Sequence, residues 1–466
     1  MIRLKNIVLG LASQDYKHVE DALLKNRAEN SLLLLAAYRN TSDTDEEISK
    51  RLKCNSNSFY VLKSRLYDKI QEVLAENIFL SKEDILQSLN LIPEMCYNNS
   101  RDVAIAYLEK LEKTLLMQDM HGELMQVYSC LKKMNVHSQK YFQYSQQYNK
   151  HVAFNLAFEK SEEILGTFSR ELSHYVLSRS KQNFDALEFM VTKINDHHSL
   201  NPSRNVEIIR NLIQLQMAAF CRGIAVPSFN AREKLQQTQA MCAELPRSNF
   251  SRAALPVVDF LLFEFYQHNG DYQSAREYFG KTNSILGKLM LLSNICPVSQ
   301  FLKLKIVYQN GDMEPEAGEQ TLVYDHDDIC SRINITLYRS ALKTLKQEYK
   351  EAAQQLNQLQ NELGFKDFIH AGFEVKLSLA YLYIRLGDYE VADNILKNVY
   401  RKIKADKLGR YDNVLYLIKV WNEEIKNPGK TISRKQKDVF LLFRMTNINE
   451  STLLEHLLPE LNRRYT

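Results

Sequence analysis

Residues that break helices are scarce in this chain of 466 residues, which contains only 14 glycines and nine prolines. Globular proteins average about 7% glycine and about 5% proline, so turn-forming residues are under-represented here. This shortage argues against a β-sandwich, a β-barrel and a glycine-rich nucleotide-binding fold, because each of these requires many turns. We therefore expect many helices that are joined by short connections.

Other absences exclude several classes of protein. No run of 18 apolar residues occurs, so we expect no membrane-spanning helix. The seven cysteines are scattered without a Cys-x-x-Cys pair, which indicates reduced thiols in a cytoplasmic protein and no zinc site. Phosphate-binding glycine motifs and the Gly-x-Ser-x-Gly motif are also missing. We predict no catalytic, cofactor-binding or metal-binding residues, and an enzyme with dispersed site residues remains a third alternative.

The charge of the chain is small and unevenly distributed. The formal net charge of +4 lies in the segment 426–466, which has eight basic and four acidic residues, while the preceding residues balance. A charge of this size does not predict bulk nucleic-acid binding, so any such binding requires a local patch.

Apolar residues follow the spacing of one helix face in several segments. Val103, Tyr107, Leu108, Leu111 and Leu115 show this three-four spacing, which is typical of amphipathic helices. No convincing set of alternating strands occurs.

A repeated pattern is the strongest feature of the sequence. Similar segments surround Gly270, Gly311 and Gly387, and a degenerate copy surrounds Gln347. These positions are 41, 36 and 40 residues apart, which is the length of one helical hairpin. A single hairpin cannot bury its apolar faces, so the spacing predicts hairpins that stack on one another. In each unit we expect the glycine to end the first helix and the following aspartate to cap the second.

The segments Tyr266-x-x-x-Gly270-Asp-Tyr-x-x-Ala275 and Tyr383-x-x-x-Gly387-Asp-Tyr-x-x-Ala392 resemble the tetratricopeptide repeat. The resemblance covers about 255–400 and weakens upstream, and the repeat is longer than the 34 residues of that family. It implies an all-α superhelical solenoid whose groove binds a protein or peptide. Residues six and two positions before each glycine would line that groove, and these are Glu264, His268, Lys305, Gln309, Tyr381 and Arg385.

The N-terminal segment has a different pattern. Thr44 and Glu47 have capping-box spacing, and an ordered apolar set follows, namely Ile48, Leu52, Phe59, Leu62 and Leu66. Residues 40–70 resemble the helix-turn-helix of sigma factors and response regulators, although Ser49 and Lys53 replace the Ala and Gly that the family prefers. The resemblance implies DNA contact through residues 50–69, which include six basic residues and one acid. The candidate contacts are Ser56, Asn57, Tyr60, Lys63 and Arg65.

These observations predict three parts: a helical domain over 1–75, a repeat solenoid over 76–426 and capping helices over 427–466. The leading functional hypothesis is a non-enzymatic scaffold or adaptor that binds a protein or peptide partner in the solenoid groove. The alternative is a cytoplasmic transcriptional regulator whose N-terminal segment binds DNA and whose solenoid senses a partner. In that alternative, the N-terminal helices could also be a polar cap of the solenoid.

Overall fold

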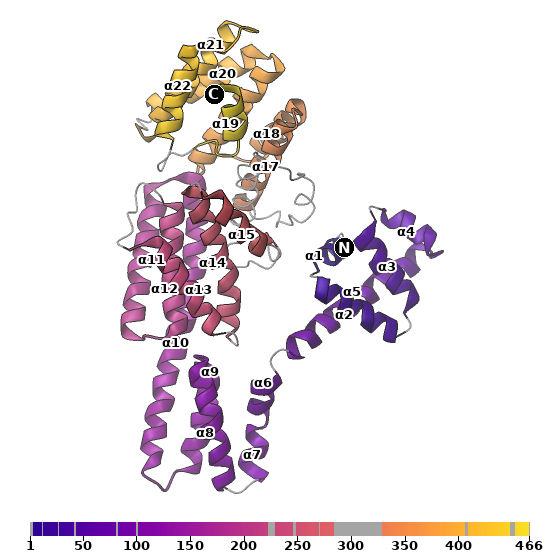
Figure 1. Ribbon diagram of the computed structural model, residues 1–466, viewed down its shortest axis with the longest axis vertical. Helices are drawn as coiled ribbons and strands as arrows, with labels where there is room; N and C mark the ends of the chain where they lie inside the picture. The colour runs from indigo at the N-terminus through magenta and orange to yellow at the C-terminus, as the bar shows by residue number, and fades with distance from the viewer. Residues whose placement is uncertain are drawn as a thin grey trace. The chain divides into compact units, whose positions relative to one another are not determined.

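The regular secondary structure of the described chain is helical in the computed structural model (Figure 1). The described residues are 3–11, 13–26, 28–41, 43–80, 83–98, 101–221, 229–245, 248–269, 271–283, 329–405, 409–447 and 453–465. Within these ranges no β-strand occurs, which confirms the all-α prediction. In the same ranges, no helix has the length and apolar character that crossing a membrane requires.

Described residues up to Asn149 form one compact unit, and those from Lys150 onward form a second. The first unit begins with five helices: α1 (Arg3–Gly10), α2 (Ser13–Lys25), α3 (Glu29–Asn40), α4 (Asp45–Arg51) and α5 (Ser56–Leu80). Their apolar faces share a core that includes Val8, Leu35, Ile48 and Leu66. The unit continues with α6 (Glu83–Asn90), α7 (Ile92–Asn98), α8 (Arg101–Met117) and α9 (His121–Met134), which surround a core of their own.

The second unit consists of helices that pack consecutively along the chain, and Lys150 lies within α10 (Lys140–Ser178). The helices that follow are α11 (Lys181–Leu200), α12 (Arg204–Phe220), α13 (Ala231–Glu244), α14 (Asn249–His268), α15 (Tyr272–Asn283), α17 (Ile329–Leu345), α18 (Tyr349–Glu362), α19 (Ile369–Leu386), α20 (Tyr389–Ala405), α21 (Asp412–Lys426), α22 (Arg434–Thr446) and α23 (Leu458–Tyr465). Neighbours such as α14 and α15, α17 and α18, and α19 and α20 pack together as hairpins. Helix α19 also contacts α17 and α21, so successive hairpins touch through their first helices.

The hairpin turns share one backbone geometry. Gly387 ends α19 with a left-handed backbone (φ 85°), as predicted, and its N–H donates to the Ile384 carbonyl at 3.2 Å. The next N–H, of Asp388, donates to the Tyr383 carbonyl at 2.9 Å, which completes a Schellman motif. Gln347, which has φ 65°, closes the degenerate copy with equivalent bonds. The turn at Gly311 lies outside the described residues.

Small residues lie where the hairpins close, as the repeat pattern predicts. Ala275, Ala352 and Ala392 are fully buried, so the two helices of each hairpin can approach closely. Asp271 caps α15, because its Oδ1 accepts the Ser274 N–H at 3.1 Å. These local interactions explain why hairpins form at these positions.

Candidate nucleic-acid interface

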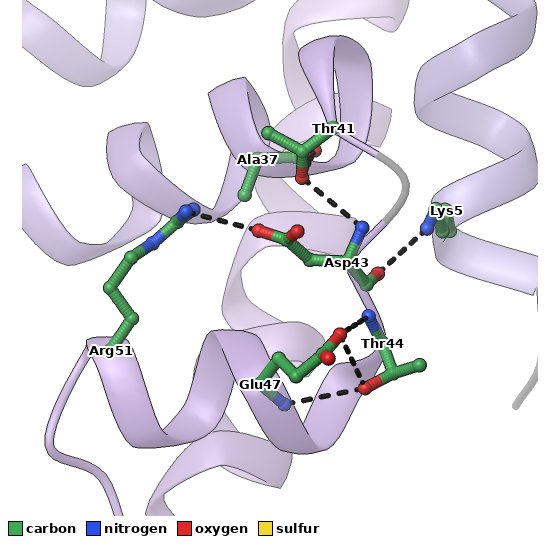
Figure 2. A network of polar contacts seen from close by, with 7 residues as sticks. All are labelled: Lys5, Ala37, Thr41, Asp43, Thr44, Glu47 and Arg51. Carbon is green, nitrogen blue, oxygen red and sulfur yellow. Dashed lines mark hydrogen bonds and ion pairs between the residues drawn. The ribbon is translucent and has the colours of Figure 1, made fainter.

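Helix α4 begins at the capping box that the sequence predicts. The Glu47 carboxylate accepts the backbone N–H of Thr44 at 2.7 Å, and the Thr44 hydroxyl accepts the N–H of Glu47 at 3.4 Å (Figure 2). The bonds from the Thr44 backbone and hydroxyl lower the pKa of Glu47. The box satisfies amides that would otherwise lack partners, so it sets the start of α4.

The turn between α4 and α5 is closed by the two residues that depart from the family pattern. Lys53 has φ 51°, the left-handed backbone that glycine adopts most readily, and its N–H donates to the Lys50 carbonyl at 3.1 Å. The Ser49 hydroxyl donates to the Cys54 carbonyl at 2.9 Å, and the Cys54 N–H donates back to the Ser49 carbonyl at 3.1 Å. Lys53 therefore occupies a glycine-like position, and Ser49 adds a bond across the turn that alanine could not make.

Helix α5 has a buried face and an exposed face, as predicted. Phe59 and Leu66 are buried against the core of the first five helices, and Leu62 is half-buried. Ser56, Asn57 and the neighbouring Ser58 are exposed at the start of α5. Three larger exposed side chains follow on the helix, namely Tyr60, Val61 and Tyr67. The first turns of α5 therefore offer polar and aromatic side chains to solvent.

Lys63 was expected to point outward, and this prediction is wrong. Its Nζ lies 2.6 Å from Asp45 Oδ2, and its side chain is only 14% exposed. Asp45 also accepts the Tyr38 hydroxyl at 2.7 Å. Partial burial of Asp45 would raise its pKa, but the hydrogen bonds from Lys63 and Tyr38 outweigh this effect and lower it. The acidic first turn of α4 lies beside Lys63, so this lysine ties α5 to α4.

A second ion pair removes another cation from the predicted patch. Arg51 contacts Asp43 at 3.0 Å, and Lys5 donates to the Asp43 carbonyl at 2.8 Å (Figure 2). Lys50, Lys53 and Arg65 are exposed. The cationic surface near α5 is therefore smaller than the count of six basic residues predicts.

The predicted partner groove is not an exposed surface at the positions that the structure describes. Glu264 and Tyr381 are fully buried, and the Tyr381 hydroxyl donates to Glu460 of α23 at 3.1 Å. Arg385 is half-buried and donates to the Tyr349 hydroxyl at 3.2 Å. The C-terminal helix covers the face of α19 that the repeat pattern assigned to a partner. The side chain of His268, together with Lys305 and Gln309, lies outside the described residues.

A buried polar cluster on α19 escaped the sequence analysis. Ser378 Oγ lies 2.9 Å from His456 Nε2, and Glu374 accepts the Leu454 N–H at 3.1 Å. His456 Nδ1 lies 4.0 Å from Glu374. The three side chains are of the types found in hydrolase triads. Ser378 and His456 are only 1% and 5% exposed, so a substrate could not reach them in this arrangement.

Burial sets the protonation of this cluster. It lowers the pKa of His456 to about 4, and it raises the pKa of Glu374 to about 7 despite the bond from Leu454. His456 is therefore neutral at pH 7, so its contact with Glu374 is not an ion pair. The cluster attaches residues 453–457 to α19. Polar residues at positions 374, 378 and 381 of an apolar helix are the pattern that could have revealed it.

The structure describes no group of three or more His, Cys, Asp or Glu side chains that could hold a metal ion. The acidic segment 325–328, with its single histidine, lies outside the described residues. Comparison of the chain with protein-family models, with curated proteins and with solved structures finds no match.

Proposed function

We propose that this chain is a non-enzymatic regulator whose N-terminal helices bind duplex DNA through a helix-turn-helix formed by α4 and α5. The exposed first turns of α5 support this proposal most directly. Ser56, Asn57 and Tyr60 lie there on a helix whose opposite face packs into the core. The major groove of DNA admits one α-helix, and small polar side chains near the start of that helix can contact base edges and phosphates.

The flanking cations allow a direct test. Replacing Lys50 and Lys53 with alanine removes two exposed charges at the end of α4 and in the turn before α5. We expect the affinity for a mixed-sequence DNA duplex to fall about tenfold. We also expect the slope of log affinity against log salt concentration to become shallower by about 2, because each phosphate contact contributes about 0.9. Fluorescence anisotropy with the full chain measures both quantities.

Lys17 and Lys25 on α2 provide the matched control, because both are exposed lysines outside the α4–α5 segment. Their double alanine variant loses the same charge and should retain the wild-type salt slope. Equal affinities for the two double variants, or a wild-type chain that binds no duplex, would contradict DNA binding through α5. Lys63 is unsuitable for this test, since its removal would leave Asp45 without its cation.

A second function, binding of a protein segment by the helical hairpins, is favoured by the exposed surface of α22. Leu441, Leu442 and Met445 are exposed within one turn of this helix. Arg434, Lys435 and Arg444 are exposed around them. An apolar surface bordered by cations complements a peptide that carries apolar side chains between acidic residues. We propose that the hairpins form a tetratricopeptide-like solenoid that binds such a partner at this end.

Substituting Leu442 and Met445 with serine should abolish capture of the partner by the immobilised full chain, because apolar anchors dominate such interfaces. A serine variant of Leu156, an exposed leucine of α10, controls for the general loss of exposed apolar area. Quantitative mass spectrometry of the captured proteins compares the variants. An unchanged set of captured proteins would rule out this surface of α22.

A further inference from the structure

A cavity of about 530 Å³ lies on the N-terminal unit, away from the exposed start of α5. It is formed by the end of α2, the start of α3 and the middle of α5, and its lining includes Ser31, Arg65 and Lys69. We propose that this cavity binds a phosphate group. The inference goes beyond the proposed function, since it uses a different surface of the unit.

The first turn of α3 supplies uncapped amides to the cavity. Ala28 precedes the helix and makes no side-chain capping bond, and the first helical bond runs from Leu32 N–H to the Ala28 carbonyl at 3.0 Å. The N–H groups of Glu29, Asn30 and Ser31 therefore have no carbonyl partner within the helix, and all three residues line the cavity. Free amides and the helix dipole together favour an anion at this position.

Ser31 is an independent indication of a ligand. Its side chain lines the cavity and is only 8% exposed, yet no residue that the structure describes hydrogen-bonds to its hydroxyl. A buried hydroxyl without a partner costs free energy, so such groups in folded proteins are nearly always paired. A phosphate oxygen in the cavity would accept this hydroxyl and the neighbouring amides together.

The charges around the cavity also favour an anion. Arg65 and Lys69 are four residues apart on α5 and line the same side, whereas Glu29 is the acidic residue of the lining. A guanidinium group pairs with two phosphate oxygens at once, and the ammonium group of lysine adds a point charge. Leu23 and Leu62 provide an apolar wall beside these groups. The phosphate could belong to the DNA backbone or to a small phosphate monoester.

Titration of the full chain with inorganic phosphate, against chloride at equal ionic strength, tests the site. We expect phosphate to slow amide hydrogen exchange in residues 29–32. The Arg65→Ala/Lys69→Ala variant should lose at least tenfold in phosphate affinity, and Ser31→Ala should lose several-fold. Glu29→Gln should bind phosphate more tightly, and this gain cannot arise from misfolding. An affinity that none of these substitutions changes, or no binding by the wild type, would overturn the proposal.

Duplex DNA distinguishes the two sources of phosphate. If Arg65→Ala/Lys69→Ala weakens both phosphate and DNA binding, the cavity holds a backbone phosphate. If it weakens phosphate binding alone, the cavity holds a small phosphate monoester. Either result supports the site. Loss of DNA binding in Lys50→Ala/Lys53→Ala with normal phosphate binding would separate this site from the interface proposed for α5.

Discussion

Replacing Glu424 with alanine is expected to lower the free energy of unfolding of the C-terminal helices by about 3 kcal/mol, because it breaks a buried charge pair. Glu424 lies on α21 and is only 8% exposed. Its carboxylate pairs with Arg464 and accepts the Tyr465 hydroxyl at 2.6 Å. The alanine variant leaves the Arg464 cation and the buried Tyr465 hydroxyl without their acceptor, which is costly in the protein interior.

Trp421 allows this effect to be measured locally. It is the single tryptophan of the chain, it is fully buried, and it precedes Glu424 by one helical turn. Urea unfolding followed by tryptophan fluorescence therefore reports on the helices that Glu424 joins. Glu423→Ala, a change at the adjacent half-buried position, should alter the unfolding free energy by less than about 0.5 kcal/mol. Equal losses in the two variants would show that the bonds to α23 contribute nothing.

Replacing Glu374 with glutamine is expected to stabilise the same helices by about 3 kcal/mol above pH 8, and by almost nothing below pH 4.5. Burial raises the pKa of Glu374 to about 7 in the folded protein, whereas the ordinary value is 4.5. Between these values the folded state binds more protons than the unfolded state, so stability decreases as the pH rises. Glutamine imitates the protonated side chain and can still accept the Leu454 N–H, so it avoids this loss.

Unfolding curves at a series of pH values, again followed by Trp421 fluorescence, test this prediction. The stability difference between Glu374→Gln and the wild type should increase with pH from about 4.5 to about 8. The low pKa of His456 affects both proteins and should cancel in the difference. Glu390→Gln, an exposed change on α20, is the control and should show no such trend. A pH-independent difference would mean that Glu374 does not titrate in this range.

The residues that sequence reasoning placed correctly interact with close neighbours along the chain. The capping box joins Thr44 to Glu47, and the turn at Gly387 depends on bonds that span at most five residues. The buried face of α5 follows from helical spacing alone. Only the turn at Gln347 lacks a revealing residue type, because there the packing of α17 against α18 holds a glutamine in a left-handed backbone.

The errors concern contacts between distant residues. Lys63 was assigned to a DNA surface because the charge of a helix face was counted without Asp45, which is 18 residues away. Tyr381 was assigned to a groove because the repeat pattern contains no information about Glu460, which is 79 residues away. Each error replaced an expected open surface with an intramolecular partner.

The sequence by itself determined that this chain is helical, where several helices begin and end, and which faces are apolar. These properties depend on backbone geometry and on residues three to five positions apart. Only the tertiary structure decided which charges are paired, that the C-terminal segment covers α19, and that α2, α3 and α5 enclose a cavity beside Arg65. These properties depend on where helices from distant parts of the chain meet, and packing of their apolar faces sets that position.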